Sequence, residues 1–203
     1  MSLFRTLTTK SWEHQGEPDS GLPGSPAIAP EKIALGFFLG VVGVLFSLFI
    51  VAYFIRMGLD DWRPMPEPLL LWINTLLLFT SSVTLQWTRI VLDHGQQKKI
   101  KAGLMAGGIF SLGFIVGQLL AWQEMTRAGY YLSSNPANAF FYVLTGIHGI
   151  HILGGLWVWT RASIRVWFGA PVEEIRLSVE LCTVYWHFLL LVWLVLFSLL
   201  AST

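Results

Sequence analysis

The chain has 203 residues, of which 54% are hydrophobic, 14% aromatic and only 12% charged, with a mean hydropathy of +0.61. Soluble domains carry about 25% charged residues, so this composition excludes an ordinary soluble protein and indicates a membrane protein. The formal net charge of +1 offers no basic surface for nucleic acid. The single cysteine, Cys182, excludes an internal disulfide and a cysteine-rich zinc site.

The first 32 residues mix charged residues with Gly, Ser and Pro and lack the apolar stretch of a signal peptide. This composition predicts a polar, flexible cytoplasmic tail over residues 1–32, followed by one membrane domain over residues 33–203. The membrane domain holds five windows free of Asp, Glu, Lys and Arg, at about 33–55, 69–88, 102–122, 139–160 and 181–200. Each is close to the roughly 20 residues that cross a bilayer. We therefore predict an all-α fold, a compact bundle of five transmembrane helices with antiparallel neighbours.

The positive charges are distributed unevenly over the connections between these windows. Ten of the thirteen Lys and Arg residues lie in the N-terminal tail, the second connection or the fourth connection. The positive-inside rule therefore predicts a cytoplasmic N-terminus and a C-terminus outside. We expect a multi-pass protein of the bacterial inner (cell) membrane, with its C-terminus on the periplasmic face.

Six polar residues stand in or beside the apolar windows: Asn74, Gln118, His148, His151, Glu180 and His187. Polar groups at membrane depth are costly without partners, so we expect these side chains to hydrogen-bond between helices. Spacings of three and seven residues place His148 with His151, and Glu180 with His187, on shared helix faces. Three glycine pairs also have the spacing that lets helices approach closely, namely Gly36/Gly40, Gly103/Gly107 and Gly113/Gly117.

The histidines leave other interpretations open. Two of them on facing helices could ligate a haem, for which Gly149, Gly154 and Gly155 would leave room, or they could contribute to a metal site. Catalytic signatures are absent from the sequence: there is no GxSxG, HExxH, phosphate-binding loop or pair of intramembrane carboxylates. The residues alone therefore predict a five-helix membrane protein with a polar seam between its helices.

Four ordered motifs resemble subunit III of the haem-copper terminal oxidases (cytochrome c or quinol oxidases), in its short five-helix form. The resemblance covers nearly all of the chain after the tail. The matching residues are Pro68, Asn74, Thr75, Ser81, Ser82 and Trp87 in the second window, Gln118 in the third, Thr145, Gly146, His148, Gly149 and His151 in the fourth, and Glu180, Tyr185, Trp186, His187 and Phe188 in the fifth.

This resemblance implies a non-catalytic accessory subunit of an oxygen-reducing, proton-translocating respiratory oxidase. In that family, haem and copper belong to subunits I and II, so no catalytic, cofactor-binding or metal-binding residue is expected in this chain. The family's subunit III packs against subunit I, stabilises it and holds phospholipids. The six polar residues would then be structural residues between helices.

The sequence departs from the family pattern at three positions that usually carry acids. These positions hold Val42, Ala121 and Leu190 here. Apolar replacements need no partner for a buried charge, so the resemblance implies a scaffold and lipid-holding role without those carboxylates. Two alternatives stay open: an accessory protein of the same family for a nitric-oxide reductase, and a stand-alone membrane carrier or bis-histidine haem protein.

Overall fold

The computed structural model describes residues 29–64, 66 and 68–202. Most of the expected tail, residues 1–28, lies outside this described part. The described chain forms five helices, α2 (Pro30–Met57), α3 (Leu70–Leu92), α4 (Gln97–Arg127), α5 (Pro136–Trp167) and α6 (Val172–Ala201). Each contains a segment long and apolar enough to cross a membrane. The expectation of an all-helical fold with five spans is confirmed.

The helices are longer than the charge-free windows that predicted them. Helix α4 begins at Gln97 and includes Lys98, Lys99 and Lys101 before the apolar stretch starts. Helix α5 likewise continues through Arg161 and Arg165 to Trp167. A charged side chain is unfavourable in hydrocarbon but not in a helix, and Lys and Arg are good helix formers. The windows therefore marked the apolar centre of each helix and not its ends.

Local sequence features end and begin the helices sharply. Gly95, Gly129 and Gly169 follow α3, α4 and α5, each with a positive φ that favours glycine. Helix α5 begins with Pro136, and the side chain of Asn135 accepts a hydrogen bond from the backbone N–H of Ala137 at 3.2 Å. These turns bring consecutive helices from α3 to α6 back alongside one another.

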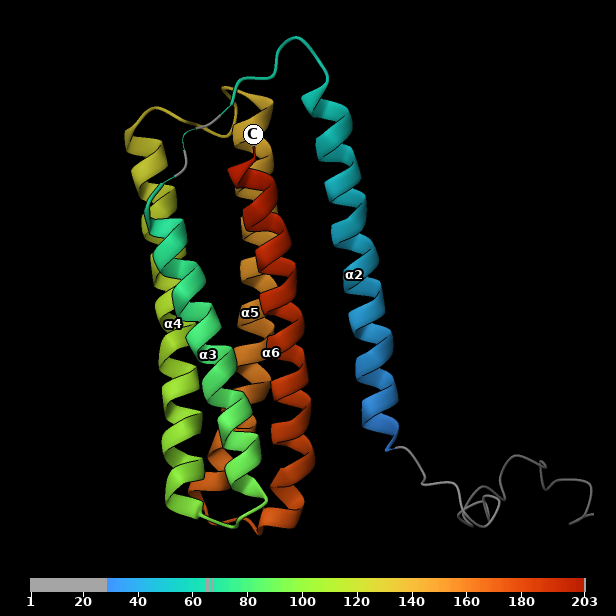
Figure 1. Ribbon diagram of the computed structural model, residues 1–203, viewed down its shortest axis with the longest axis vertical. Helices are drawn as coiled ribbons and strands as arrows, with labels where there is room; N and C mark the ends of the chain where they lie inside the picture. Colours follow the sequence, from blue (N-terminus) through green and yellow to red (C-terminus); the bar gives the residue numbers. More distant parts are fainter. Residues whose placement is uncertain (1–28, 65, 67, 203) are drawn as a thin grey trace, which may run out of the picture.

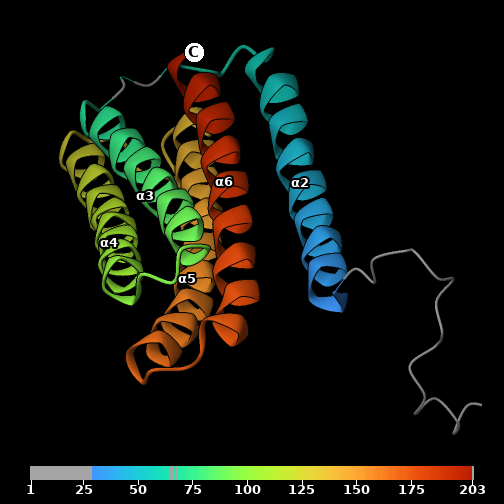
Figure 2. The ribbon, with the colours of Figure 1, turned by 60° about the horizontal axis from the view of Figure 1, so that its bottom comes forward.

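Helices α3 to α6 pack together, whereas α2 stands to one side of them (Figure 1). Within the described part of the chain, α2 contacts only α5 and α6, although α3 follows it in sequence. A second view shows α6 lying between α3 and α2 (Figure 2). Consecutive helices run in opposite directions, as predicted (Figure 1). Helix α2 joins the bundle through α5 and α6 and not through α3, its neighbour in sequence.

Glycines on α4 explain the close packing of α3 against α4. A Cβ atom added at Gly103 would lie 2.1 Å from Thr88 Oγ1, and one at Gly117 would lie 2.0 Å from Asn74 Oδ1. Only hydrogen fits at these positions, as expected for small residues between membrane helices. The Gly36/Gly40 pair on α2 differs, because a Cβ there would meet nothing within 4 Å. The same spacing thus marks a helix contact on α4 and an open surface on α2.

Candidate functional site

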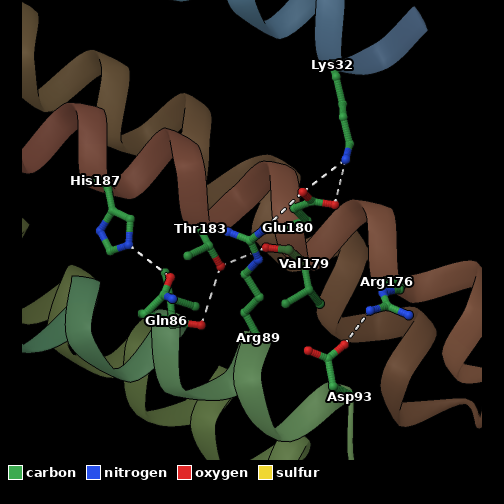
Figure 3. A network of polar contacts seen from close by, with 10 residues as sticks. Lys32, Gln86, Arg89, Asp93, Arg176, Val179, Glu180, Thr183 and His187 are labelled. Carbon is green, nitrogen blue, oxygen red and sulfur yellow. Dashed lines mark hydrogen bonds and ion pairs between the residues drawn. The ribbon is translucent and has the colours of Figure 1, made fainter. Parts of the chain in front are cut away.

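The site is a seam of polar contacts that joins the helices, and it starts at one end of the bundle. We call this the charged end; it is marked by Lys32, Arg89, Asp93, Arg176 and Glu180 (Figure 3). The Glu180 carboxylate on α6 lies 2.9 Å from Lys32 Nζ on α2 and 3.0 Å from Arg89 Nη2 on α3. An acid beside the hydrocarbon requires cationic partners. Glu180 therefore ties three helices together.

His187 connects α6 to α3 at a level further along the helices from the charged end. Its Nε2 lies 3.1 Å from the Gln86 Oε1 atom and its Nδ1 lies 2.5 Å from the Ser82 hydroxyl. Because a carbonyl oxygen only accepts, Nε2–H donates to Gln86, and in the neutral ring Nδ1 accepts from Ser82. Both ring nitrogens of His187 are thus used within the chain.

Asn74 and Gln118 join α3 to α4 inside the bundle. The Asn74 Nδ2 group donates to Gln118 Oε1 at 3.3 Å, and both side chains are buried. Asn74 Oδ1 and Gln118 Nε2 have no partner among the described residues. Asn74 lies against Gly117, whose missing side chain makes room for the Asn74 amide.

Two buried tryptophans on α6, Trp186 and Trp193, complete the seam. Trp186 belongs to the motif of the fifth window, but neither indole was expected to bond between helices. Trp186 Nε1 donates to the Ser111 hydroxyl at 2.8 Å, and Trp193 Nε1 donates to the Thr75 hydroxyl at 2.9 Å. Ser111 in turn lies 2.7 Å from the Ser81 hydroxyl. An indole N–H in the middle of an apolar helix needs an acceptor on a neighbouring helix. This requirement is the feature of the sequence from which the two contacts could have been predicted.

His148 and His151 lie in surroundings of a different kind. His148 is fully buried among the rings of Phe46, Phe114 and Trp193, with centroids 5.2–6.3 Å from its own. Its two nitrogens have no hydrogen-bond partner among the described residues. His151 Nδ1 donates to the Ile147 carbonyl of its own helix at 2.8 Å.

This arrangement does not fit a bis-histidine haem. Aromatic rings pack around His148 where a macrocycle would have to lie, and His187 directs both nitrogens to α3. Within residues 29–64, 66 and 68–202, no three His, Cys, Asp or Glu side chains gather as a metal ion requires. The contacts of the seam join α3 to α4 and α3 to α6.

The three positions at which the resemblance implies acids hold apolar, packed residues. Val42 on α2 and Ala121 on α4 are buried, and Leu190 on α6 is half-buried. Val42 lies one turn before Phe46, whose ring contacts His148 and His151. A carboxyl at position 42 would therefore enter an aromatic and histidine-containing environment.

An apolar cavity of about 290 Å³ lies between α2, α5 and α6. Gly154 and Gly155 of α5 form one wall, and Phe38 of α2 forms part of another. The remaining lining residues are Leu35, Val158, Leu181, Cys182, Tyr185 and Trp186. The cavity exists because α2 stands away from the other four helices and because the glycines leave its wall without side chains.

Comparison with known proteins identifies the family. Residues 33–201 match the family model of cytochrome c oxidase subunit III. The probable cytochrome c oxidase subunit 3 of Mycobacterium tuberculosis is 27% identical over 167 residues, covering 81% of this chain and 79% of the relative. Cytochrome c oxidase subunit 3 of Thermostichus vulcanus is 27% identical over 184 residues, with 84% and 87% covered. The corresponding protein of Arabidopsis thaliana is 29% identical over 139 residues, with 68% and 49% covered.

The family match begins in α2 and ends in α6, so it includes all five transmembrane helices and the polar seam between them. The chain belongs to the cytochrome c oxidase subunit III family.

Proposed function

We propose that this chain is the non-catalytic accessory subunit of an oxygen-reducing, proton-translocating respiratory oxidase. In this role it packs against the subunits that hold haem and copper, subunits I and II, and stabilises subunit I. The observation that carries the proposal is the family match over residues 33–201. It is supported by the seam, in which Glu180, His187 and Trp186 bond to neighbouring helices of the same chain.

The apolar cavity supports a second part of this role, the holding of phospholipid. Its walls expose almost only carbon atoms, and its volume suits an acyl chain. Lys32 lies at the charged end of α2, one turn before Leu35, which lines the cavity. A lipid with its chain in this cavity would place its headgroup near that cation.

The charges support an orientation for the complex. The charged end carries Lys32, Arg89 and Arg176, and the second and fourth connections lie at the same end of the bundle (Figure 1). By the positive-inside rule this end faces the cytoplasm, and the C-terminus then lies outside, which is the periplasm in a bacterium.

Removal of the chain from the purified oxidase tests the proposed role. We expect oxygen consumption per haem to start at the rate of the complete complex and then to decline faster during turnover. Readdition of the chain would slow the decline. Loss of the initial rate while haem and copper contents stay unchanged would contradict a non-catalytic role, and so would a haem absorption spectrum in the isolated chain.

A further inference from the structure

Helix α6 lies between α3 and α2 (Figures 1 and 2), and its exposed residues form a continuous surface with those of α3. His187 is exposed on this surface, and Gln86 of α3 lies half-buried beside it. A groove of about 160 Å³ lies between α2 and α6, further from the charged end than His187. It is lined in part by Gly43, Ser47 and Leu191. The surface is therefore apolar for most of its length and polar at one place.

The polar place lies inside the membrane. His187 follows Glu180 by seven residues, which corresponds to about 10 Å along a helix that rises about 1.5 Å per residue. Gln86 precedes Arg89 by three residues, or about 4.5 Å. Both residues belong to the membrane-spanning segments of α3 and α6. The pair thus lies one to two helical turns deeper than the ion pairs at the charged end (Figure 3).

Gln86 has hydrogen-bonding capacity that the chain does not use. Its carbonyl oxygen accepts from His187, but its two Nε2 hydrogens have no acceptor among the described residues. A primary amide that faces hydrocarbon with free donors is unfavourable, because acyl chains offer no acceptor. Polar side chains at this depth usually face protein.

The outer face of α4 provides a comparison within the same chain, because it carries no exposed polar residue between positions 105 and 119. Its exposed residues between positions 105 and 119 are all apolar, namely Met105, Ile109, Leu112, Val116 and Leu119. This face suits lipid chains. The surface around Gln86 combines exposed Val83, Leu191 and Leu194 with the polar pair, which is the pattern of a contact between membrane helices.

We propose that this surface, made of Val83, Gln86, His187, Leu191 and Leu194 and called the α3–α6 strip, binds one transmembrane helix of a partner polypeptide. The partner helix presents a hydrogen-bond acceptor, a hydroxyl or carbonyl oxygen, at the depth of Gln86. The inference rests on the proposed function, because an accessory subunit must contact another subunit of its complex. It specifies which surface of this chain makes that contact.

Site-specific photo-crosslinking in native membranes tests the α3–α6 strip. A photoreactive residue replaces Leu191 in one chain and Leu119 on α4 in the control, and the two leucines are 61% and 55% exposed. We expect position 191 to form a covalent product with another subunit of the co-purified complex, and position 119 to form lipid adducts. Lipid adducts alone at position 191 would overturn the inference.

Two pairs of variants separate a failure of the strip from a failure of folding. Leu191→Trp adds bulk to the strip, and Leu119→Trp adds the same bulk to α4. Gln86→Leu removes the amide, and Gln123→Leu makes the same change at an exposed position of α4. We expect Leu191→Trp and Gln86→Leu to lower retention of the chain in the complex roughly fivefold or more. The α4 variants should be retained normally.

The melting temperature of the isolated chain should not change with Leu191→Trp, because the side chain is exposed. Normal retention of Leu191→Trp in the complex would overturn the inference while leaving the proposed function intact. Failure of the unmodified chain to co-purify with any oxidase subunit would instead contradict the proposed function. The two failures are therefore distinguishable.

Discussion

Lys32 and Glu180 are 148 residues apart in the chain, yet the Lys32 Nζ atom lies 2.9 Å from Glu180 Oε2. This ion pair is one of the few contacts that connect α2 to the other helices, since α2 meets only α5 and α6 within the described residues. At the opposite end, the ring of Tyr53 packs against those of Trp62 and Phe140. Helix α2 is thus held at both ends, with an apolar cavity between them.

The first prediction concerns this attachment. Glu180→Gln removes the charge that pairs with Lys32 and leaves Arg89 without its acid. We expect the free energy of unfolding to fall by about 1 kcal/mol, because both pairs are partly exposed to solvent. A spin label on α2 should also report a broader range of distances to α6. Glu124→Gln, an exposed position on α4, is the control and should change neither quantity.

The second prediction concerns the α3–α4 contact. Gly117→Ala places a methyl group where the Asn74 amide now lies, so Asn74 must move and weaken its bond to Gln118. We expect a loss of about 1–3 kcal/mol of stability, as for overpacked cores. Gly36→Ala makes the same change where nothing lies within 4 Å and should leave the melting temperature unchanged. Equal melting temperatures for the two variants would show that α3 and α4 are not packed this closely.

The charge-free windows predicted all five helices correctly, because hydrocarbon excludes charge along the whole span. They could not predict that α2 stands apart. Its inner residue Val42 and its outer residue Val41 are chemically alike, and a lipid-facing surface is as apolar as one that packs against a helix. A lipid-facing residue can be told from a helix-packing residue on α2 only when the positions of α5 and α6 are known.

Six polar residues were expected to bond between helices, and two of them, His148 and His151, make no such side-chain bond within the described residues. Asn74, Gln118 and His187 do meet polar groups of other helices, but the partners Ser82 and Gln86 could not be selected from the many polar residues of α3. Glu180 needed a cation, which the sequence indicates, but Lys32 and Arg89 were only two of thirteen positive residues. Which pairs form depends on how each helix is rotated about its axis relative to its neighbours. A single sequence does not specify this rotation.

The third prediction compares two histidines. His148→Leu removes a buried ring whose nitrogens have no partner among the described residues, so stability should stay the same or rise by about 1 kcal/mol. His187→Leu leaves Ser82 and Gln86 without their partner and should cost about 1–2 kcal/mol. Thermal unfolding of both variants in the same detergent measures the difference. A larger loss for His148→Leu would show that its nitrogens are bonded in the native protein.

His187→Ala extends this prediction to the complex. We expect a lower yield of assembled oxidase, with initial turnover per haem nearly unchanged, because the residue joins helices and also lies in the α3–α6 strip. An immediate loss of turnover per haem in a fully assembled complex would assign His187 a different role.

The fourth prediction introduces the acid that the resemblance implies at position 42. Val42→Glu places a carboxyl among the aromatic rings near His148, in a site that is otherwise apolar. We expect weaker assembly, at a cost of roughly 3 kcal/mol if the carboxyl stays charged. The control Val42→Gln introduces a side chain of the same size as Glu but without the charge, so it separates the effect of charge from that of shape. Normal assembly with faster proton uptake would contradict this expectation.

The fifth prediction concerns pH at the other end of α2. The Arg56 guanidinium lies 2.5 Å from Asp61, and its hydrogen bond holds the pKa of Asp61 below the ordinary value of 3.8. A lowered carboxyl pKa stabilises the folded chain above the ordinary value, and this contribution disappears as pH falls through the lowered value. Asp61→Asn should therefore melt at a lower temperature than the parent near neutral pH. In strong acid the two should melt together, and a difference that persists there would contradict the ion pair.

The central claim is that this chain works as subunit III of a respiratory oxidase. The most direct measurement is a mild-detergent pull-down of the tagged chain from native membranes, with the partners identified by mass spectrometry. We predict recovery of oxidase subunits I and II in equal amounts with the chain. Recovery of nitric-oxide reductase subunits, or of the chain alone, would contradict the claim.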